Sequence, residues 1–426
     1  MEDEKSNELR EIKPSNIQRI ILISVIVYSI TLVFHAVYTT YIDPSYQVII
    51  ADQIVFYNRG KGVLSGLLPY RDFYTKAAPL SSYLWAPMIL FSMIVTNDYS
   101  PGLLTVSNYT DSASMMFSSY VFRGFFAVCL MAAAIFLYKL LEMKKNKHSF
   151  WISIAFAINP FFIYLVSFWG SDECLLPLLI LLPIYLFERK KNYLAIVVII
   201  IGSGLKYVPI FLAPLIWIYT QDWKQRIIQT LVFLLGITAT YLPFFFVDPV
   251  QFLAQFDNKI VHEGNQSFLT IIQSYSSTNF DSYSYVFTIV MIIVLAGISL
   301  FLFIKRYQWN FQKMNILFIV FIILYPKFQF SFVVLMYPFL FILIFRKGII
   351  RWISLVLLFT SMIGGEMGNL LVNRLTNNIF LISLAWIIIL LFYLSMICIL
   401  FITLTDSAQE TFINYEEKDC SETSKN

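Results

Sequence analysis

Long apolar runs recur along the chain, separated by short polar or charged stretches. About 20 consecutive apolar residues are enough to cross the hydrocarbon core of a bilayer as a helix. The pattern therefore predicts a series of helices that cross a membrane out and back. We predict full-length spans at residues 17–41, 118–141, 149–168, 173–188, 227–247, 285–304, 351–368 and 379–403.

Two further apolar stretches are interrupted by polar residues. Residues 193–220 contain GSGLKYVP (202–209), and a later apolar stretch turns at YPKFQF (325–330). We expect a pair of short helices around each break, with Lys206 and Lys327 near the turns. Broken helices with a charge at the break are tolerated in a membrane where they line a polar cavity, so both breaks are candidate functional positions.

Lysine and arginine concentrate in the short cytoplasmic loops of membrane proteins, which sets the topology. With every basic cluster inside, the chain makes about twelve crossings and both termini are cytoplasmic. The apolar segment 79–95 would then be one crossing too many. It is short and contains Pro79 and Pro87, so we predict a juxtamembrane or re-entrant helix on the outer face, in the first loop. The basic clusters are Lys5/Arg10/Lys13/Arg19, Lys139/Lys144/Lys145/Lys147, Arg189/Lys190/Lys191, Lys224/Arg226, Lys305/Arg306/Lys313 and Arg346/Lys347/Arg351.

Composition supports the membrane class. The 426 residues are 58% hydrophobic and only 13% charged, with a mean hydropathy of +0.72, whereas about a quarter of a soluble domain is charged. We predict an all-α polytopic protein made of a cytoplasmic segment (1–16), one membrane domain (17–403) and an acidic, disordered cytoplasmic tail (404–426). The net charge of +4 reflects basic loops rather than a nucleic-acid partner.

Four polar residues at predicted span ends are candidates for chemistry. Asp43 ends the first span and could be an ordinary solvated loop charge. Asp172 lies between two spans and could simply favour a helix N-terminus. Lys206 and Lys327 could extend to the lipid headgroups, or bind an anion such as the phosphate of a lipid carrier.

Motifs of soluble enzymes are missing from the sequence. There is no phosphate-binding GxGxxG or GxxxxGK[ST], and the three histidines and four cysteines show no metal-ligand spacing. A nucleotide cofactor is therefore not expected.

A set of stretches, in order, resembles the GT-C glycosyltransferases, and among them the mannosyltransferases that depend on polyprenol-phosphate-mannose. In that family an acid after the first span is often paired with a second acid nearby. Here Asp43 is followed by Pro44 and Ser45, so the second acid would be Asp52 or Asp172. The similar stretches are Asp43 after the first span, LSGLLPYRDFYTKAAPLSSYL (64–84), INPFFIYLVSFWGSDECLLPLLILL (158–182), GSGLKYVPIFLAPL (202–215), GNQSFLTIIQ (264–273) and YPKFQFSFVVLMYPFL (325–340).

The resemblance implies a GT-C-like fold and an inverting transfer of a hexose, mannose in the named group. The donor would be a polyprenyl- or dolichyl-phosphate sugar, and the acceptor a lipid-linked glycan or glycoconjugate on the outer face of the membrane. The membrane would be a prokaryotic plasma membrane, or the ER membrane with a lumenal site in a eukaryote.

The resemblance also implies roles for residues. Asp43 would be the base or would position the acceptor, Asp172 would be a second acid, and Asp52 a helper. Whether a divalent metal (Mg or Mn) takes part stays open, with Asp43 and Asp172 as its candidate ligands. The candidate donor-phosphate cations are Lys206, Lys327 and Arg71.

Two other classes of membrane protein share some of these features. A lipid or solute transporter or flippase also uses broken helices, but it tends to carry its ionisable groups near the midplane and to show internal repeats. A polymerase or ligase of lipid-linked glycans would be expected to have its large outer loop late in the chain, whereas here the prominent outer loop, 42–78, comes first.

Overall fold

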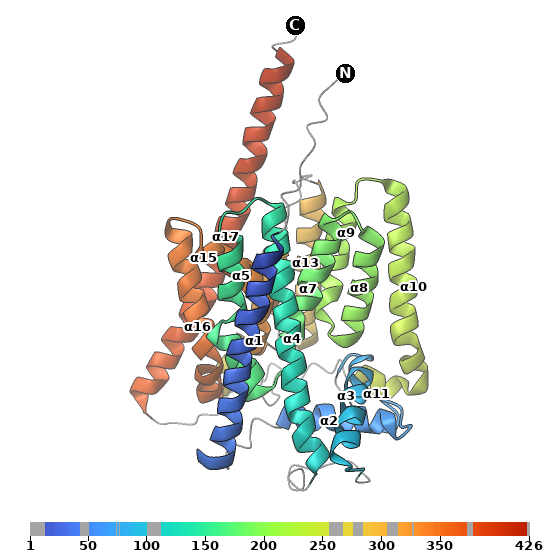
Figure 1. The fold of residues 1–426 in the computed structure, drawn as a ribbon. Helices are drawn as coiled ribbons and strands as arrows, with labels where there is room; N and C mark the ends of the chain where they lie inside the picture. Colours follow the sequence, from blue (N-terminus) through green and yellow to red (C-terminus); the bar gives the residue numbers. More distant parts are fainter. Residues whose placement is uncertain are drawn as a thin grey trace. The chain divides into compact units, whose positions relative to one another are not determined.

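The described part of the chain is helical and contains no β-strand in this computed structural model (Figure 1). The all-α fold predicted from the sequence is confirmed. The residues that the structure describes are 13–42, 51–73, 75, 77–99, 112–254, 267–275, 284–304, 314–325, 328–372 and 378–423.

The contacts of the chain group into two compact units. Unit 1 comprises Met1–Ile210 and Leu231–Gln255, and unit 2 comprises Phe211–Thr230 and Phe256–Asn426.

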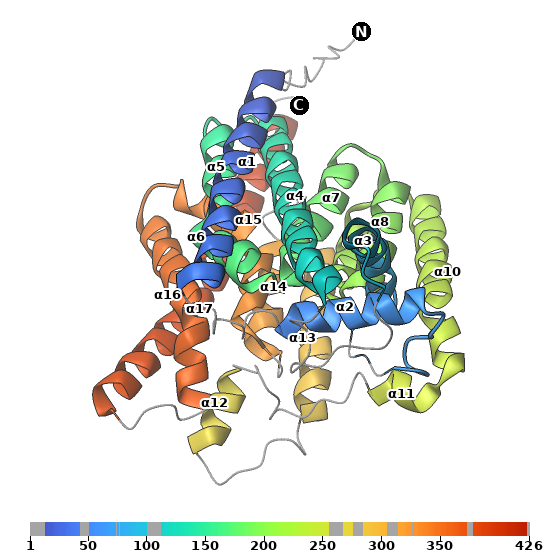
Figure 2. The ribbon, with the colours of Figure 1, turned by 60° about the horizontal axis from the view of Figure 1, so that its bottom comes forward.

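Unit 1 is a bundle built on the long helix α4 (Ala113–Met143), which contacts α1, α3, α5 and α7. The helix α2 lies across one end of α4 in both ribbon views (Figures 1 and 2). The other elements of unit 1 are α1 (Pro14–Val37), η1 (Tyr38–Ile42), α2 (Ala51–Leu64), α3 (Ser81–Thr96), α5 (Ser149–Ala157), α6 (Pro160–Ile163), η4 (Tyr164–Trp169), η5 (Asp172–Leu175), α7 (Leu176–Glu188), α8 (Asn192–Leu205), most of η6 (Val208–Phe211), the second part of α10 (Trp223–Val247) and α11 (Pro249–Ala254).

Unit 2 is centred on the helix pair α16 and α17, against which α14 and α15 pack. The Tyr337 hydroxyl on α15 lies 2.8 Å from the Ser361 hydroxyl on α16, so a buried polar contact joins these helices. The elements of unit 2 are α9 (Leu212–Tyr219), the first part of α10, α12 (Phe268–Tyr275), α13 (Ser284–Ile304), α14 (Met314–Leu324), η9 (Phe330–Leu335), α15 (Tyr337–Ile344), α16 (Ile349–Val372) and α17 (Ile379–Thr423).

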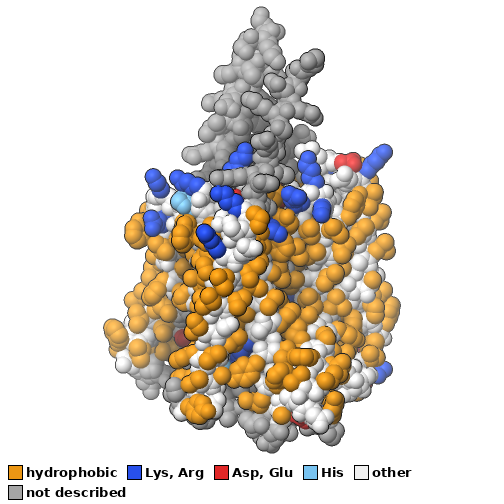
Figure 3. Space-filling view, in the orientation of Figure 1, with side chains coloured by type: hydrophobic (Ala, Val, Ile, Leu, Met, Phe, Trp, Pro, Cys, Tyr) orange, Lys and Arg blue, Asp and Glu red, His pale blue; other side chains and the backbone are white. Residues whose placement is uncertain are grey.

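Six described helices are long and apolar enough to cross a membrane, and several shorter apolar helices accompany them. Hydrophobic side chains cover most of the face shown in Figure 3. These helices and the mean hydropathy of +0.72 are those of an integral membrane protein.

Breaks in the helices follow the polar and proline signals of the sequence. As predicted, the run 193–220 is interrupted, because α8 ends at Leu205 and α9 begins only at Leu212. The span expected at 149–168 is also broken, which the sequence analysis missed. There Asn159 caps a new helix turn, its side chain accepting a hydrogen bond from the Phe161 N–H, and Pro160 supplies no N–H to continue α5.

The structure differs from the sequence prediction in the C-terminal tail and in the loop after α10. The disordered tail expected after residue 403 is wrong, since α17 continues as a helix to Thr423. The helices α11 and α12 were not predicted, because each is only a few residues long and lies beside a polar loop.

The basic loops of unit 1 lie at one end of its bundle. Lys144, after α4, forms an ion pair of 2.9 Å with Glu188 at the end of α7, so the α4–α5 and α7–α8 connections are neighbours. The chain from Asp172 to Glu188 rises about 28 Å, close to the thickness of a hydrocarbon core. Asp172 therefore lies at the opposite end of α7 from the basic loops.

The side of the membrane on which α3 lies is open to a labelling test. The helix has 16 residues and contains Pro87; at about 24 Å it is shorter than a hydrocarbon core of about 30 Å. We therefore expect a cysteine introduced as Ser107→Cys, in a chain with serine at its four native cysteines, to react with an impermeant maleimide added outside intact cells.

The matched control is Lys190→Cys in the basic α7–α8 loop, which we expect to react only after the membrane is permeabilised. If Ser107→Cys is protected to the same extent as Lys190→Cys, then segment 79–95 crosses the membrane.

Candidate active site

A tight turn delivers two acids to the start of α7. Gly170 ends the π-helix η4 with a φ of +67°, a left-handed conformation that costs a glycine little. The next residue, Ser171, donates its N–H to the Leu165 carbonyl at 3.0 Å, which closes the turn. The chain then enters η5 with Asp172 and Glu173 in its first turn.

Lys206, the partner of these acids, lies at the break after α8. Lys206 has an extended backbone and ends α8, with its N–H donating to the Gly202 carbonyl at 2.8 Å. The Gly204 carbonyl accepts a 2.7 Å hydrogen bond from Leu80, just before α3. A Cβ at Gly204 would lie 2.6 Å from the Leu80 side chain, so a larger residue at this position would require Leu80 to move.

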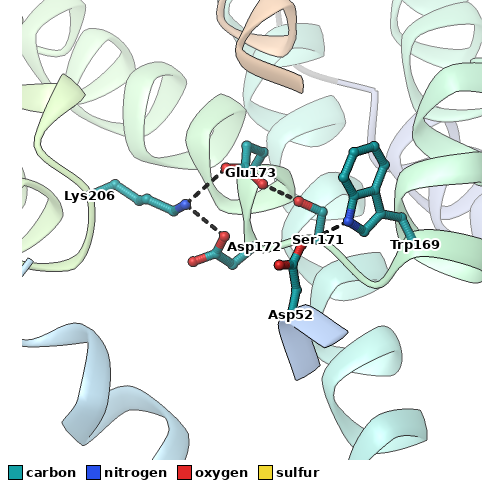
Figure 4. A network of polar contacts seen from close by, with 6 residues as sticks. All are labelled: Asp52, Trp169, Ser171, Asp172, Glu173 and Lys206. Carbon is teal, nitrogen blue, oxygen red and sulfur yellow. Dashed lines mark hydrogen bonds and ion pairs between the residues drawn. The ribbon is translucent and has the colours of Figure 1, made fainter. Parts of the chain in front are cut away.

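One lysine is shared by two buried acids, a group that we call the acid–lysine cluster: Asp172, Glu173 and Lys206 (Figure 4). The Lys206 Nζ lies 2.6 Å from Asp172 Oδ1 and 3.2 Å from Glu173 Oε1. The exposed fraction of the side chain is 12% for Asp172, 11% for Glu173 and 18% for Lys206. The Ser171 hydroxyl donates a further hydrogen bond to Glu173.

A third acid faces the cluster from α2. The Trp169 indole N–H donates to Asp52 Oδ2 at 2.7 Å, which orients this carboxylate (Figure 4). Asp52 reaches solvent, but the surrounding protein partly desolvates it. This desolvation and the negative charge of Glu173 raise the pKa of Asp52, although Lys206 and Arg59 act in the opposite direction.

A second cation, Arg59, belongs to the same electrostatic environment. It lies seven residues after Asp52 on α2, two helical turns away and on the same face of the helix. Burial lowers the pKa of Arg59, while the charges of Asp172 and Asp52 oppose that shift. Tyr70 and Tyr207 also interact with this guanidinium.

Ionisation within the acid–lysine cluster is set by burial and by the shared ammonium. Burial raises the pKa of Asp172 to about 6; Lys206 opposes this shift and Glu173 adds to it. Burial also disfavours the charged form of Glu173, but Lys206 and the Ser171 hydroxyl outweigh it, so the pKa of Glu173 is lowered. For Lys206 the two carboxylates outweigh burial and raise its pKa, so the ammonium stays charged.

The structure brings together three of the residues predicted from the sequence, Asp52, Asp172 and Lys206. Arg71 is placed differently: its guanidinium is 54% exposed and forms an ion pair of 2.8 Å with the adjacent Asp72. Asp43 and Lys327 lie outside the described residues.

Three residues of this site were not singled out from the sequence. Neither Glu173 nor Trp169 was named as a candidate from the sequence. Arg59 carried a usable signal, because its spacing from Asp52 places both on one face of a helix. The contact of Trp169 with Asp52 had no such signal, because 117 residues separate them.

The described residues do not make a metal site by themselves. Asp172 and Glu173 each give one oxygen to Lys206. Within the ranges that the structure describes, no group of three or more His, Cys, Asp or Glu side chains is arranged to hold a metal ion. We therefore derive no chemical step through a metal.

The comparison with known proteins identifies the family. The model of glycosyltransferase family 87 matches residues 112–326, about half of the chain, including the whole acid–lysine cluster. The curated proteins compared with the chain gave no match. Family 87 is a GT-C-type family of membrane glycosyltransferases, so the expected GT-C relationship is confirmed. The chain belongs to glycosyltransferase family 87.

Proposed function

We propose that this glycosyltransferase moves a hexose from a polyprenyl-phosphate sugar to a hydroxyl of a glycan acceptor, on the side of the membrane opposite the basic loops. The observation that carries the proposal is the contact of Lys206 with Asp172 and Glu173, which Asp52 faces from α2 (Figure 4). Arg59 lies on the same face of α2 as Asp52, and the charges of Asp52 and Asp172 act on it. Such a site offers a base to deprotonate the acceptor hydroxyl and cations to stabilise the departing phosphate, and the reaction requires both.

Asp52 has the properties of a general base. It reaches solvent, where an acceptor hydroxyl could approach, and the Trp169 indole orients its carboxylate. A raised pKa brings a carboxylate closer to the pH at which a base works best. Asp43, the base predicted by resemblance, is a second candidate for this role.

The proposed reaction is a single inverting displacement. The base takes the proton of the acceptor hydroxyl while its oxygen attacks the anomeric carbon, and the bond from that carbon to the phosphate oxygen breaks. The lipid phosphate leaves with the bonding electron pair, so negative charge develops on it and a nearby cation stabilises the transition state.

Arg59 is the cation best suited to the donor phosphate among the described residues. Lys206 is already shared by two carboxylates, which compensate its charge. Arg59 has a planar guanidinium that suits bidentate binding of a phosphate, and the acids face it through space. Lys206, Lys327 and Arg71, which the sequence analysis predicts to bind the donor phosphate, remain further candidates for this role.

A lipid-linked donor accounts for the lack of nucleotide-binding motifs in the sequence. Mannose is the sugar that the resemblance suggests, so the function test offers purified protein labelled polyprenyl-phosphate mannose, glucose and arabinose. The proposal expects transfer to a glycan acceptor from at least one donor. In vesicles, movement of the donor across the bilayer without transfer would favour a flippase instead.

The catalytic acids are tested in the same assay by Asp52→Asn and Asp43→Asn. A general base typically contributes about 100- to 10,000-fold to a rate, so loss of the base should lower kcat by that range. We expect this fall in kcat for whichever of Asp52→Asn and Asp43→Asn removes the base. Both variants should be expressed at the normal level.

Asp222→Asn, in the connection between α9 and α10, is the matched control and should keep full activity. Near-normal kcat in both Asp52→Asn and Asp43→Asn would overturn the assignment of the base to either acid.

The pH profile of kcat/KM tests the charges around the base. Activity should fall as the pH drops, because protonation removes the base, with a midpoint above the usual aspartate range since the pKa values of Asp52 and Asp172 are raised. Lys206 lowers both of these pKa values, so Lys206→Gln should move the midpoint to higher pH.

Lys206→Arg keeps the charge and should leave the midpoint in place, and Lys190→Gln in the basic loop should do the same. Breaking a buried ion pair costs about 3–5 kcal/mol, so elution as a single folded species is checked first. If the midpoint in Lys206→Gln is unchanged or moves to lower pH, then Lys206 does not lower the pKa of the base.

Donor binding is tested by Arg59→Gln. A hydrogen bond to a charged group contributes about 1.5–3 kcal/mol, so the KM for the donor should rise about 10- to 100-fold while the KM for the acceptor changes little. Arg189→Gln, in the basic loop after α7, is the control. An unchanged donor KM in Arg59→Gln would remove Arg59 from the donor site.

A further inference from the structure

A second arginine, Arg123 in the middle of α4, is fully buried and 0% exposed. No carboxylate lies within ion-pair distance of its guanidinium among the residues that the structure describes. A buried charge without an anion is costly unless polar groups surround it. The polar groups that surround Arg123 come from α4 itself and from three other elements of unit 1, namely η4, α2 and α1.

The first set of contacts holds the end of η4. Arg123 Nε donates to the Ser167 carbonyl at 3.1 Å, and Nη2 donates to the Phe168 carbonyl at 3.3 Å. Carbonyls in the last turn of a helix lack partners within it. Arg123 supplies those partners directly before Trp169 and the turn that leads to Asp172.

The second contact holds α2. Arg123 Nη1 donates to Gln53 Oε1 at 3.1 Å, and Gln53 is fully buried next to Asp52. A Cβ at Gly170 would lie 1.8 Å from Gln53 Nε2. Gln53 is therefore packed between the guanidinium and the Gly170 turn, so these contacts fix the start of α2 against the loop that carries the other acids.

The remaining contacts lie on α4 and α1. Arg123 Nη1 also donates to the Ser119 carbonyl at 3.3 Å and to its hydroxyl, and Nη2 lies 3.4 Å from His35 Nε2. Only arginine presents five N–H donors in a rigid plane, which allows one side chain to reach all these acceptors. A lysine would reach fewer of them and would hold none in a fixed orientation.

We propose that Arg123 is a positioning residue for sugar transfer, which fixes Asp52 on α2 and the Trp169–Asp172 turn relative to one another. The inference rests on the function proposed above for these acids. Arg123 touches neither substrate in this proposal; it acts through Gln53 and the carbonyls of η4.

The test compares Arg123→Lys with a matched arginine in the purified full-length protein. Displacement of catalytic groups by about 1 Å costs about 100-fold in rate, so kcat should fall by about that factor while the donor KM stays within about threefold. Arg226 also donates to two backbone carbonyls, those of Thr220 and Ile218, so Arg226→Lys controls for loss of this kind of contact and should keep kcat.

Gln53 provides a second pair of variants. Gln53→Met removes the acceptor for Arg123 at similar size and should lower kcat, whereas Gln53→Glu retains an acceptor and should be more active than Gln53→Met. Wild-type kcat in Gln53→Met would show that the link from Arg123 to α2 has no effect on catalysis.

Amide hydrogen exchange gives a readout that needs no activity. Arg123→Lys should speed exchange in residues 51–60 and 165–175 and leave α7 and α8 unchanged. Wild-type kcat with wild-type exchange would overturn the proposal, and so would faster exchange throughout unit 1 with a lower melting temperature, which indicates a general structural role.

Failure of the proposed function is separable from failure of this inference. If the wild-type protein transfers sugar from none of the three donors, the function is wrong, and the exchange experiment alone decides the positioning role. Faster exchange confined to the two segments then supports it, and unchanged exchange refutes it.

Discussion

The shared ammonium of Lys206 is the interaction on which the site depends. Two adjacent buried carboxylates, Asp172 and Glu173, repel each other, and desolvation disfavours the charge on each. One ammonium within 2.6 and 3.2 Å of them offsets both effects. Removal of such a partner leaves uncompensated buried charge, which costs about 3–5 kcal/mol. Because α8 ends at Leu205, the next residue, Lys206, places its ammonium at the start of α7.

Two cations of unit 1, Lys206 and Arg123, have different partners and different effects. Lys206 meets carboxylates and sets their ionisation, whereas Arg123 meets carbonyls and an amide and sets the geometry of the backbone. The difference follows from their chemistry, since lysine is a compact point charge and arginine a planar set of donors. Arg59 is the third cation, and the charges of Asp172 and Asp52 act on it.

Much of the fold was predictable from the sequence, because a membrane helix depends on local composition. The break at 202–209 and the short helix at 79–95 were both read from apolar runs interrupted by glycine, proline and lysine. The break at Asn159 was missed, because the apolar residues on both sides of it form one continuous run in hydropathy. The helical end of α17 was missed because a charged composition was taken to indicate disorder.

The sequence by itself determined the membrane class, the helical character of the apolar runs and the relationship to GT-C glycosyltransferases, since each depends on local patterns. It also named Asp52, Asp172 and Lys206 as candidates. Only the tertiary structure decided which of these meet, because contacts across 117 residues, as between Asp52 and Trp169, depend on helix packing. Packing also decided the role of Arg123, which in the sequence is one basic residue within an apolar run.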